Sequence, residues 1–184
     1  MILYLVRHAE KEREGENPPL TKNGIRQAKY LAKKLGKVKF DKFYSSDTNR
    51  TKQTSEIVSK KIKMKPKIEK TFNEYEAEDI KKKFSKWKKN EKKRVQEMYK
   101  VLDKIFTKQE KEETILIVAH GITNRIIASY LLELNLDKMI RLRQHETCIN
   151  LIKWSDKWKN WQLDKWNEQT HIPKRYKTKW VKQE

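Results

Sequence analysis

Two histidines stand directly after short apolar segments that lie far apart in the chain. His8 comes after the apolar run 1–6 and Arg7, and His120 follows residues 114–119. Continuous runs rich in Ile, Leu and Val are typical of strands that are buried on both faces. Ligand sites in open α/β sheets lie at the carboxyl ends of the strands. We therefore expect both histidines to emerge side by side at one edge of a sheet.

A phosphate group is the ligand that these residue types suit. Phosphoryl transfer needs positioned cations for the non-bridging oxygens, an in-line nucleophile and a proton for the leaving oxygen. Arg7 and Arg50 offer planar guanidinium groups for those oxygens. His8 can attack phosphorus through one ring nitrogen when a hydrogen bond to the other nitrogen fixes its tautomer. A helix that begins after His120-Gly121 would point its first amide groups at the same anion.

Five fragments in a fixed order carry a resemblance to a known family. They are Arg7-His8; Pro19-Leu20-Thr21 with Gly24, Gln27 and Ala28; Ser45-Ser46 with Arg50 and Thr54; Glu74; and Ala119-His120-Gly121. The closing segment of the family is matched by Trp161, Leu163, Asn167, His171 and Ile172. With these fragments at compatible spacing, the chain resembles the histidine phosphatase superfamily, the phosphoglycerate mutase-like enzymes.

The resemblance implies a role for each matched residue. His8 would be the nucleophile and would pass through a phosphohistidine intermediate. His120 would stabilise the charge that builds on the transferring group, and Glu74 would protonate the leaving oxygen and later help water to attack. The expected phosphate-binding set is Arg7, Arg50, His120 and Gly121.

The identity of the acid is open among three carboxyl groups. Glu74 matches the acidic position of the family, but Glu76 and Glu78 follow closely, and the glycines that the family places after the acid are missing. A solvated acidic loop is the alternative role for the whole segment. Because a proton donor must stay partly protonated near neutral pH, we expect burial or neighbouring negative charge to raise the pKa of Glu74.

Two departures from the family pattern favour hydrolysis of the phosphohistidine over the mutase reaction, in which the phosphoryl group is returned to the substrate. The loop after Glu10 is short and charged, and the stretch between Glu74 and the second histidine is compact, whereas a mutase must keep water away from its phosphohistidine. We expect a metal-independent phosphatase that acts on phosphomonoesters. A phosphoglycerate-type mutase and a catalytically idle basic binding protein are the alternatives. The sequence contains neither HExxH nor CxxC, and its four histidines are well separated, so we expect no metal and no cofactor.

The charge of the chain favours anionic partners. Its 45 basic against 25 acidic residues give a formal net charge of +20, which suits a small phosphorylated, polyanionic substrate. The lysines from Lys81 to Lys89 could rim the pocket. The densest basic run, 81–94, could bind nucleic acid. We favour a solvated helix face for it, because basic residues are spread along most of the chain.

A single cysteine, Cys148, and the lack of a signal peptide or a membrane span predict a cytoplasmic protein without a membrane partner.

The elements that must position these residues alternate between strand and helix. We expect one domain over residues 1–184, an α/β three-layer αβα sandwich around a mostly parallel sheet, with the phosphoglycerate mutase-like fold. The first expected helix runs from a Thr21 cap to Gly36, with Ile25, Ala28, Leu31, Ala32 and Leu35 on one face. The middle of the chain should contain a strand over Phe40–Ser45, a helix capped by Ser46 or Asp47, an extended segment at Pro66–Ile68 and one or two helices over Ile80–Phe106. The last expected elements are a helix after Gly121 reaching Leu134 and a hairpin of Ile149–Trp154 and Trp161–Leu163. We expect His145 and His171 to be structural or exposed.

Overall fold

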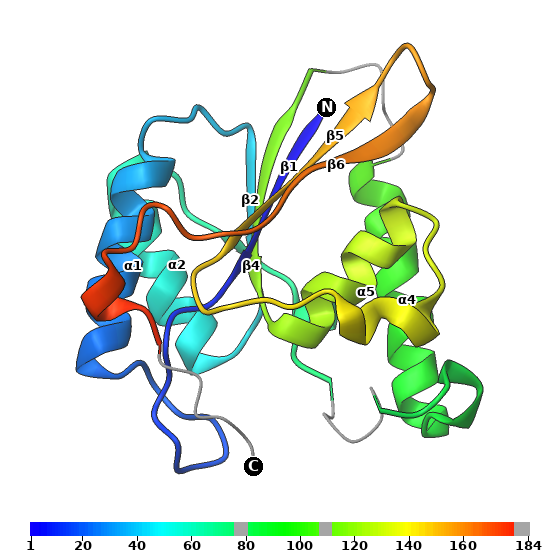
Figure 1. Ribbon diagram of the computed structural model, residues 1–184, viewed down its shortest axis with the longest axis horizontal. Coiled ribbons are helices and arrows are strands. Elements are labelled where there is room, and N and C mark those ends of the chain that lie inside the picture. The colour runs from blue at the N-terminus through cyan, green and yellow to red at the C-terminus, as the bar shows by residue number, and fades with distance from the viewer. Residues whose placement is uncertain (76–80, 107–111, 179–184) are drawn as a thin grey trace.

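A six-stranded sheet forms the centre of the protein (Figure 1). The structure is a computed structural model, and it describes residues 1–75, 81–106 and 112–178. The strands are β1 (Ile2–Arg7), β2 (Lys42–Ser45), β3 (Lys67–Ile68), β4 (Thr114–Ala119), β5 (Ile149–Ser155) and β6 (Asn160–Glu168), in the spatial order β3-β2-β4-β1-β5-β6.

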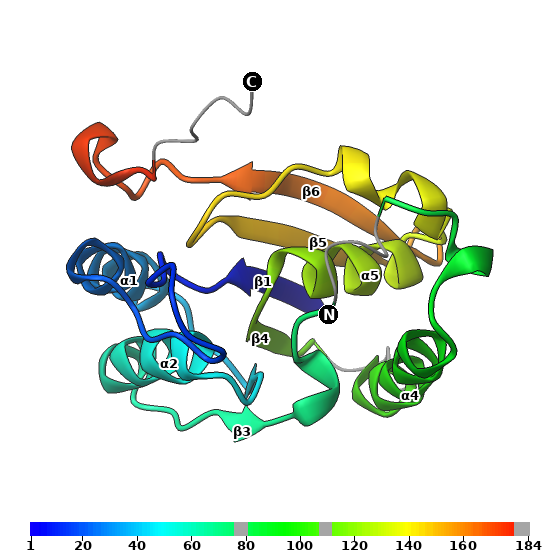
Figure 2. The ribbon, with the colours of Figure 1, turned by 90° about the horizontal axis from the view of Figure 1, so that it is seen from below.

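Helices cover both faces of this sheet (Figures 1 and 2). α1 (Lys22–Leu35) and α2 (Asn49–Ile62) lie on one side, and α4 (Lys89–Phe106) and α5 (Gly121–Leu131) lie on the other. Short 3₁₀ turns occupy Lys70–Phe72, Phe84–Lys86, Leu136–Arg141 and Lys174–Tyr176. The expected three-layer α/β architecture is therefore confirmed. Among the described helices, none combines the length and apolar character that crossing a membrane requires.

The middle of the sheet is parallel. β4 pairs in parallel with both β1 and β2, and β2 pairs in parallel with β3, whereas β5 runs antiparallel to β1 and β6. In the β1–β4 register Arg7 lies opposite Ala119. The residues that follow these two positions, His8 and His120, therefore leave the sheet next to each other.

The alternation of side chains along β1 and β4 explains the continuous apolar run in the middle of each strand. Leu3, Leu5, Ile115 and Ile117 are fully buried in the core that includes residues of α4 and α5. Val6, Leu116 and Val118 are fully buried in a second core with residues of α1 and α2. Since successive side chains of a strand point to opposite faces, a strand covered on both faces is apolar along its buried middle, and polar residues such as Arg7 and Thr114 stand at its ends.

The helix α1 packs closely against the chain that follows His8. Thr21 caps this helix as expected, because its hydroxyl accepts a hydrogen bond from the Gly24 N–H at 2.8 Å. A Cβ at Gly24 would lie only 2.0 Å from the Glu10 carbonyl oxygen. The face that packs therefore includes Gly24, and Ile25 is turned to the edge and is 40% exposed. The expectation that Ile25 lies on the buried face is wrong.

Several expected boundaries also shift. α2 is capped by Thr48 rather than by Ser46 or Asp47, since the Ser46 hydroxyl contacts His120 and the Asp47 carboxylate pairs with Lys52. β2 begins at Lys42 instead of Phe40, and α5 ends at Leu131, which leaves Leu134 exposed beyond it. The hairpin is confirmed, with a second strand that continues to Glu168.

The basic run 81–94 is helical only in its second part. Ile80 lies outside the described residues, Phe84–Lys86 forms a 3₁₀ turn, and α4 begins at Lys89. The predicted helix over Ile80–Phe106 is thus a single α-helix with a separate turn before it. Most lysines of the run are exposed, but Arg94 at its end is partly buried.

We expect Gly24→Ala to lower the free energy of unfolding by about 1–3 kcal/mol, because the new methyl group must push the Glu10 backbone away. Gly36→Ala is the matched control. Its Cβ would meet the flexible Lys61 side chain at 2.7 Å and the Ala32 carbonyl oxygen at 3.2 Å, and Gly36 has ordinary helical dihedral angles. Urea unfolding of the two variants measures the difference, and equal losses would contradict the close packing at Gly24.

Candidate active site

The two histidines meet at the carboxyl ends of β1 and β4. Their ring centroids lie 5.1 Å apart, with the planes at 64°. The His8 N–H donates to the Ala119 carbonyl at 3.0 Å, which extends the β1–β4 pairing by one residue. Both side chains are buried. The sheet register thus brings together two residues that are 112 positions apart in the sequence.

The tautomer of His8 is fixed by the backbone beside it. Nδ1 lies 2.7 Å from the Ala9 carbonyl oxygen, so Nδ1–H donates and the lone pair of Nε2 stays free. The Ala9 N–H in turn donates to Thr54 Oγ1 at 3.1 Å. Burial, followed by the charge of Arg7, holds the pKa of His8 well below its ordinary value. The imidazole is therefore neutral near pH 7, as a nucleophile must be.

The ring of His120 is held by hydroxyl groups. Its Nε2 lies 2.7 Å from Ser46 Oγ, which lies 2.8 Å from Thr51 Oγ1. Its Nδ1 is buried without a hydrogen-bond partner among the described residues, and Glu74 Oε2 lies 4.0 Å from it. Burial, and then the proximity of His8, lowers the pKa of His120. When the Ser46 hydroxyl donates to Nε2, Nδ1 carries the proton and can donate to an anion.

Arg7 is anchored on one side by two acceptors. Nη1 donates to the Gln144 carbonyl at 2.7 Å, and Nη2 pairs with Glu146 Oε1 at 2.8 Å. Gly121 begins α5 beside this guanidinium, and a Cβ built on it would meet Arg7 Nε at 3.6 Å. The expected phosphate-binding residues Arg7 and Gly121 therefore lie together.

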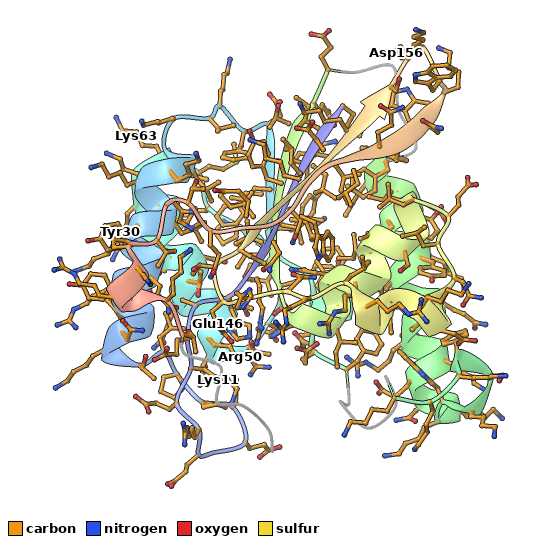
Figure 3. All side chains as sticks on the ribbon, in the orientation of Figure 1. Lys11, Tyr30, Arg50, Lys63, Glu146 and Asp156 are labelled. Carbon is orange, nitrogen blue, oxygen red and sulfur yellow. The ribbon has the colours of Figure 1, made fainter. Side chains whose placement is uncertain are left out.

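Arg50 approaches from α2, where it occupies the first turn as expected. Its Nε is buried without a hydrogen-bond partner among the described residues. Burial lowers the pKa of the guanidinium, and the nearby Glu74 opposes that change. Figure 3 shows Arg50, Lys11 and Glu146 close together at this end of the sheet.

The carboxyl group of Glu74 lies against the first residues of α5. Its Oε1 accepts from the N–H groups of Ile122 at 3.2 Å and Thr123 at 3.4 Å. Burial raises the pKa of Glu74, whereas Arg7 lowers it. This is the direction expected for a carboxyl group that must hold a proton. The other two candidates, Glu76 and Glu78, lie outside the described residues.

A cavity of about 910 Å³ opens beside His8. The loop after β1 gives it charges of both signs, and the C-terminal segment reaches it at Thr178. Its lining consists of Arg7, His8, Glu10, Lys11, Glu12, Arg13, Glu14, Pro19, Thr21, Glu146 and Thr178. Among the described residues, the run 81–89 contributes nothing to this lining, so the expectation that its lysines rim the pocket is wrong for this cavity.

The comparison with known protein families agrees with this geometry. The model of the histidine phosphatase superfamily, branch 1, matches residues 3–103 and 91–169. The chain belongs to the histidine phosphatase superfamily. No curated protein matches its sequence.

Solved structures of several phosphatases have the same fold. A phosphoserine phosphatase from Entamoeba histolytica, in complex with 3-phosphoglyceric acid, is 20% identical, with a TM-score of 0.73 over 92% of this chain and 98% of that one. A mycobacterial glucosyl-3-phosphoglycerate phosphatase is 16% identical, with a TM-score of 0.76 over 94% and 99%. The alpha-ribazole phosphatase of Shigella flexneri is 21% identical, with a TM-score of 0.72 over 91% and 96%. The expected phosphoglycerate mutase-like fold is confirmed.

Several residues that support this histidine phosphatase site could not be found from the sequence. Gln144 Oε1 accepts from Asn124 Nδ2 at 3.1 Å and Asn150 Nδ2 at 3.2 Å, which fixes the segment whose carbonyl receives Arg7. Glu146 carries no sequence signal, because its partner Arg7 is 139 residues away. Ser46 lies in a matched fragment, but its contact with His120 depends on the fold.

The remaining two histidines do not line the cavity beside His8. The His171 side chain is 3% exposed and its Nδ1 lies 3.8 Å from Glu168 Oε2, and His145 Nδ1 lies 2.8 Å from Asn167 Nδ2. Among the described residues, no group of three or more His, Cys, Asp or Glu side chains is arranged to hold a metal ion. Metal independence stays a prediction, which a chelator can test.

We expect Ser46→Ala to lower the free energy of unfolding by about 1–3 kcal/mol, because it leaves buried His120 Nε2 without a partner. Ser129→Ala is the control. The Ser129 hydroxyl is buried and has no hydrogen-bond partner among the described residues, so its removal should leave stability unchanged or raise it. Urea unfolding compares the two, and equal changes would contradict a structural role for the Ser46–His120 hydrogen bond.

Proposed function

We propose that this protein is a metal-independent phosphatase that hydrolyses phosphomonoesters through a phosphohistidine intermediate on His8. The observation that carries the proposal is the free Nε2 of a neutral His8, whose Nδ1 is committed to the Ala9 carbonyl at 2.7 Å, beside a second histidine and two arginines. A nucleophile, cationic ligands and a carboxyl group with a raised pKa are the parts that phosphoryl transfer requires.

In the first step, the phosphoryl oxygens bind the guanidinium groups of Arg7 and Arg50 and the ring of His120. Nε2 of His8 attacks phosphorus in line with the ester oxygen, a P–N bond forms and the P–O bond to the leaving group breaks. Glu74 gives its proton to that oxygen, so the alcohol leaves neutral. Gly121 at the start of α5 adds the positive end of the helix to the site.

In the second step, the Glu74 carboxylate takes a proton from a water molecule as the water oxygen attacks phosphorus. The P–N bond breaks, inorganic phosphate forms, and both His8 and Glu74 return to their starting states. The same carboxyl group serves as acid and then as base, which is possible when its pKa lies near the working pH.

Hydrolysis is favoured over the mutase reaction. The solved structures compared above are named phosphatases, and the cavity beside His8 is lined by charged groups that would admit water. We expect the substrate to be small and phosphorylated, with more than one negative charge, because the chain carries a formal net charge of +20, which attracts anionic ligands. The single domain over 1–184 and the cytoplasmic location stay predictions.

We expect His8→Ala to abolish phosphate release from 4-nitrophenyl phosphate, measured with excess chelator present. The wild type should be active under these conditions and should carry acid-labile phosphate after rapid quenching. His145→Ala is the control, since His145 lies outside the cavity. Equal activity in the wild type and His8→Ala would contradict the mechanism, and loss of activity with the chelator would contradict metal independence.

The pH profile of kcat/KM should be bell-shaped. Activity requires neutral His8, so it is lost as pH falls through a pKa that lies below 6.5. It also requires protonated Glu74, so it falls as pH rises through a pKa that lies above 4.5. Glu74→Gln should lose the alkaline limb, keep the acidic one and be slower by about 10²–10⁴-fold. Glu12→Gln, in the same cavity, should keep both limbs; an alkaline limb that survives in Glu74→Gln would exclude Glu74 as the acid.

A further inference from the structure

The helix α4 contributes no group to the mechanism above. Its Arg94 side chain nevertheless makes hydrogen bonds to the backbone of the segment that carries Glu74. Nη2 of Arg94 donates to the carbonyl oxygens of Asn73 and Glu74, each at 3.0 Å. Nη1 of the same guanidinium donates to both carboxylate oxygens of Glu91, at 2.8 and 3.0 Å. Arg94 therefore joins α4 directly to the backbone of Glu74.

The guanidinium of Arg94 is itself held in place. The Glu91 side chain, one turn earlier on α4, is almost completely buried. The other face of the guanidinium lies over the ring of buried Tyr75, with its central carbon 4.3 Å from the ring centroid. A planar group with a carboxylate at one end, two carbonyls at the other and an aromatic ring beneath has little freedom to move.

The backbone that Arg94 contacts has no regular structure of its own. Asn73, Glu74 and Tyr75 follow the 3₁₀ turn Lys70–Phe72 and belong to no helix or strand. Their carbonyl groups therefore lack the hydrogen-bond ladder that positions residues on a strand such as β1. Contacts from other elements must supply that support.

Two further contacts fix Asn73, one residue before the acid. Its Oδ1 accepts from the Asp47 N–H at 2.8 Å, and its carbonyl accepts from Thr123 Oγ1 at 3.2 Å. The carbonyl of Glu74 itself is held by Arg94. Arg94 thus acts on the residue whose side chain must reach the leaving oxygen.

We propose that Arg94 is a positioning residue that sets the place of the Glu74 carboxyl group relative to the leaving oxygen. This inference rests on the proposed function. A displacement of about 1 Å in a reacting group can cost about 10²-fold in rate, so the two hydrogen bonds to this backbone have a direct catalytic consequence. A purely structural role would instead reduce all activities in proportion to the folded fraction.

The leaving group separates these two roles. An alkoxide leaves slowly without a proton donor, whereas 2,4-dinitrophenolate leaves readily without one. The quantity to compare is kcat/KM, because it reports the steps up to release of the alcohol or phenol and omits the later attack by water. Arg94→Lys keeps the charge but loses the planar group that joins the carboxylate to two carbonyls.

For Arg94→Lys we expect kcat/KM for ethyl phosphate to fall about 10–100-fold and that for 2,4-dinitrophenyl phosphate to fall about threefold or less. The double variant with Glu74→Gln should be no slower than Glu74→Gln alone, since a misplaced acid matters only when the acid is present. Lys93→Ala, an exposed lysine on the same helix, should leave both values unchanged.

Glu91→Gln provides a second variant if Arg94→Lys does not fold. It weakens the anchor of Arg94 and should give the same selective loss with ethyl phosphate. Equal losses on the two substrates, or multiplied losses in the double variant, would overturn the role of Arg94 while leaving the phosphatase function intact. A wild type that releases phosphate from neither substrate would overturn the proposed function, and the inference with it.

Discussion

The parallel pairing of β1 with β4 brings His8 and His120 together, and the other parts of the candidate site are arranged around that pair. The pairing continues through the His8 N–H to the Ala119 carbonyl, so the distance between the two rings follows from the sheet register. Shifting the register by one residue would move every side chain of a strand to the other face. Because β1 and β4 pack into a core on each face, a shifted register would have to repack both cores, and this close packing holds the register in place.

Burial at this sheet edge also sets the charge states of the site. Removal from water lowers the pKa of both histidines and raises that of Glu74, and the arginines add to the effect on the histidines. The result is a pair of neutral imidazoles beside fixed guanidinium charges. In the proposed mechanism, a phosphoryl group supplies negative charge beside these guanidinium groups, while the burial that lowers the pKa of His8 keeps its imidazole unprotonated for attack.

The two halves of the site have different kinds of support. His8 and His120 follow strands of the central sheet, whereas Glu74 lies on irregular chain between the start of α5 and the guanidinium of Arg94. Such a segment depends on contacts from distant elements for its position. In the proposed mechanism, α4 contributes to the chemistry by holding the backbone of Glu74 through Arg94, although it presents no group to the phosphate.

The sequence by itself determined the central strands, the Thr21 cap and the pairing of His8 with His120, because burial on two faces and capping leave local signals in residue type and spacing. It misplaced Ile25, since the packing of α1 depends on the approach of Gly24 to the Glu10 backbone. Only the tertiary structure decided the partners of the site residues. Contacts such as Arg7–Glu146 and Arg94–Glu74 join segments far apart in the chain, and a single charged residue gives no periodic or local pattern that would reveal its partner.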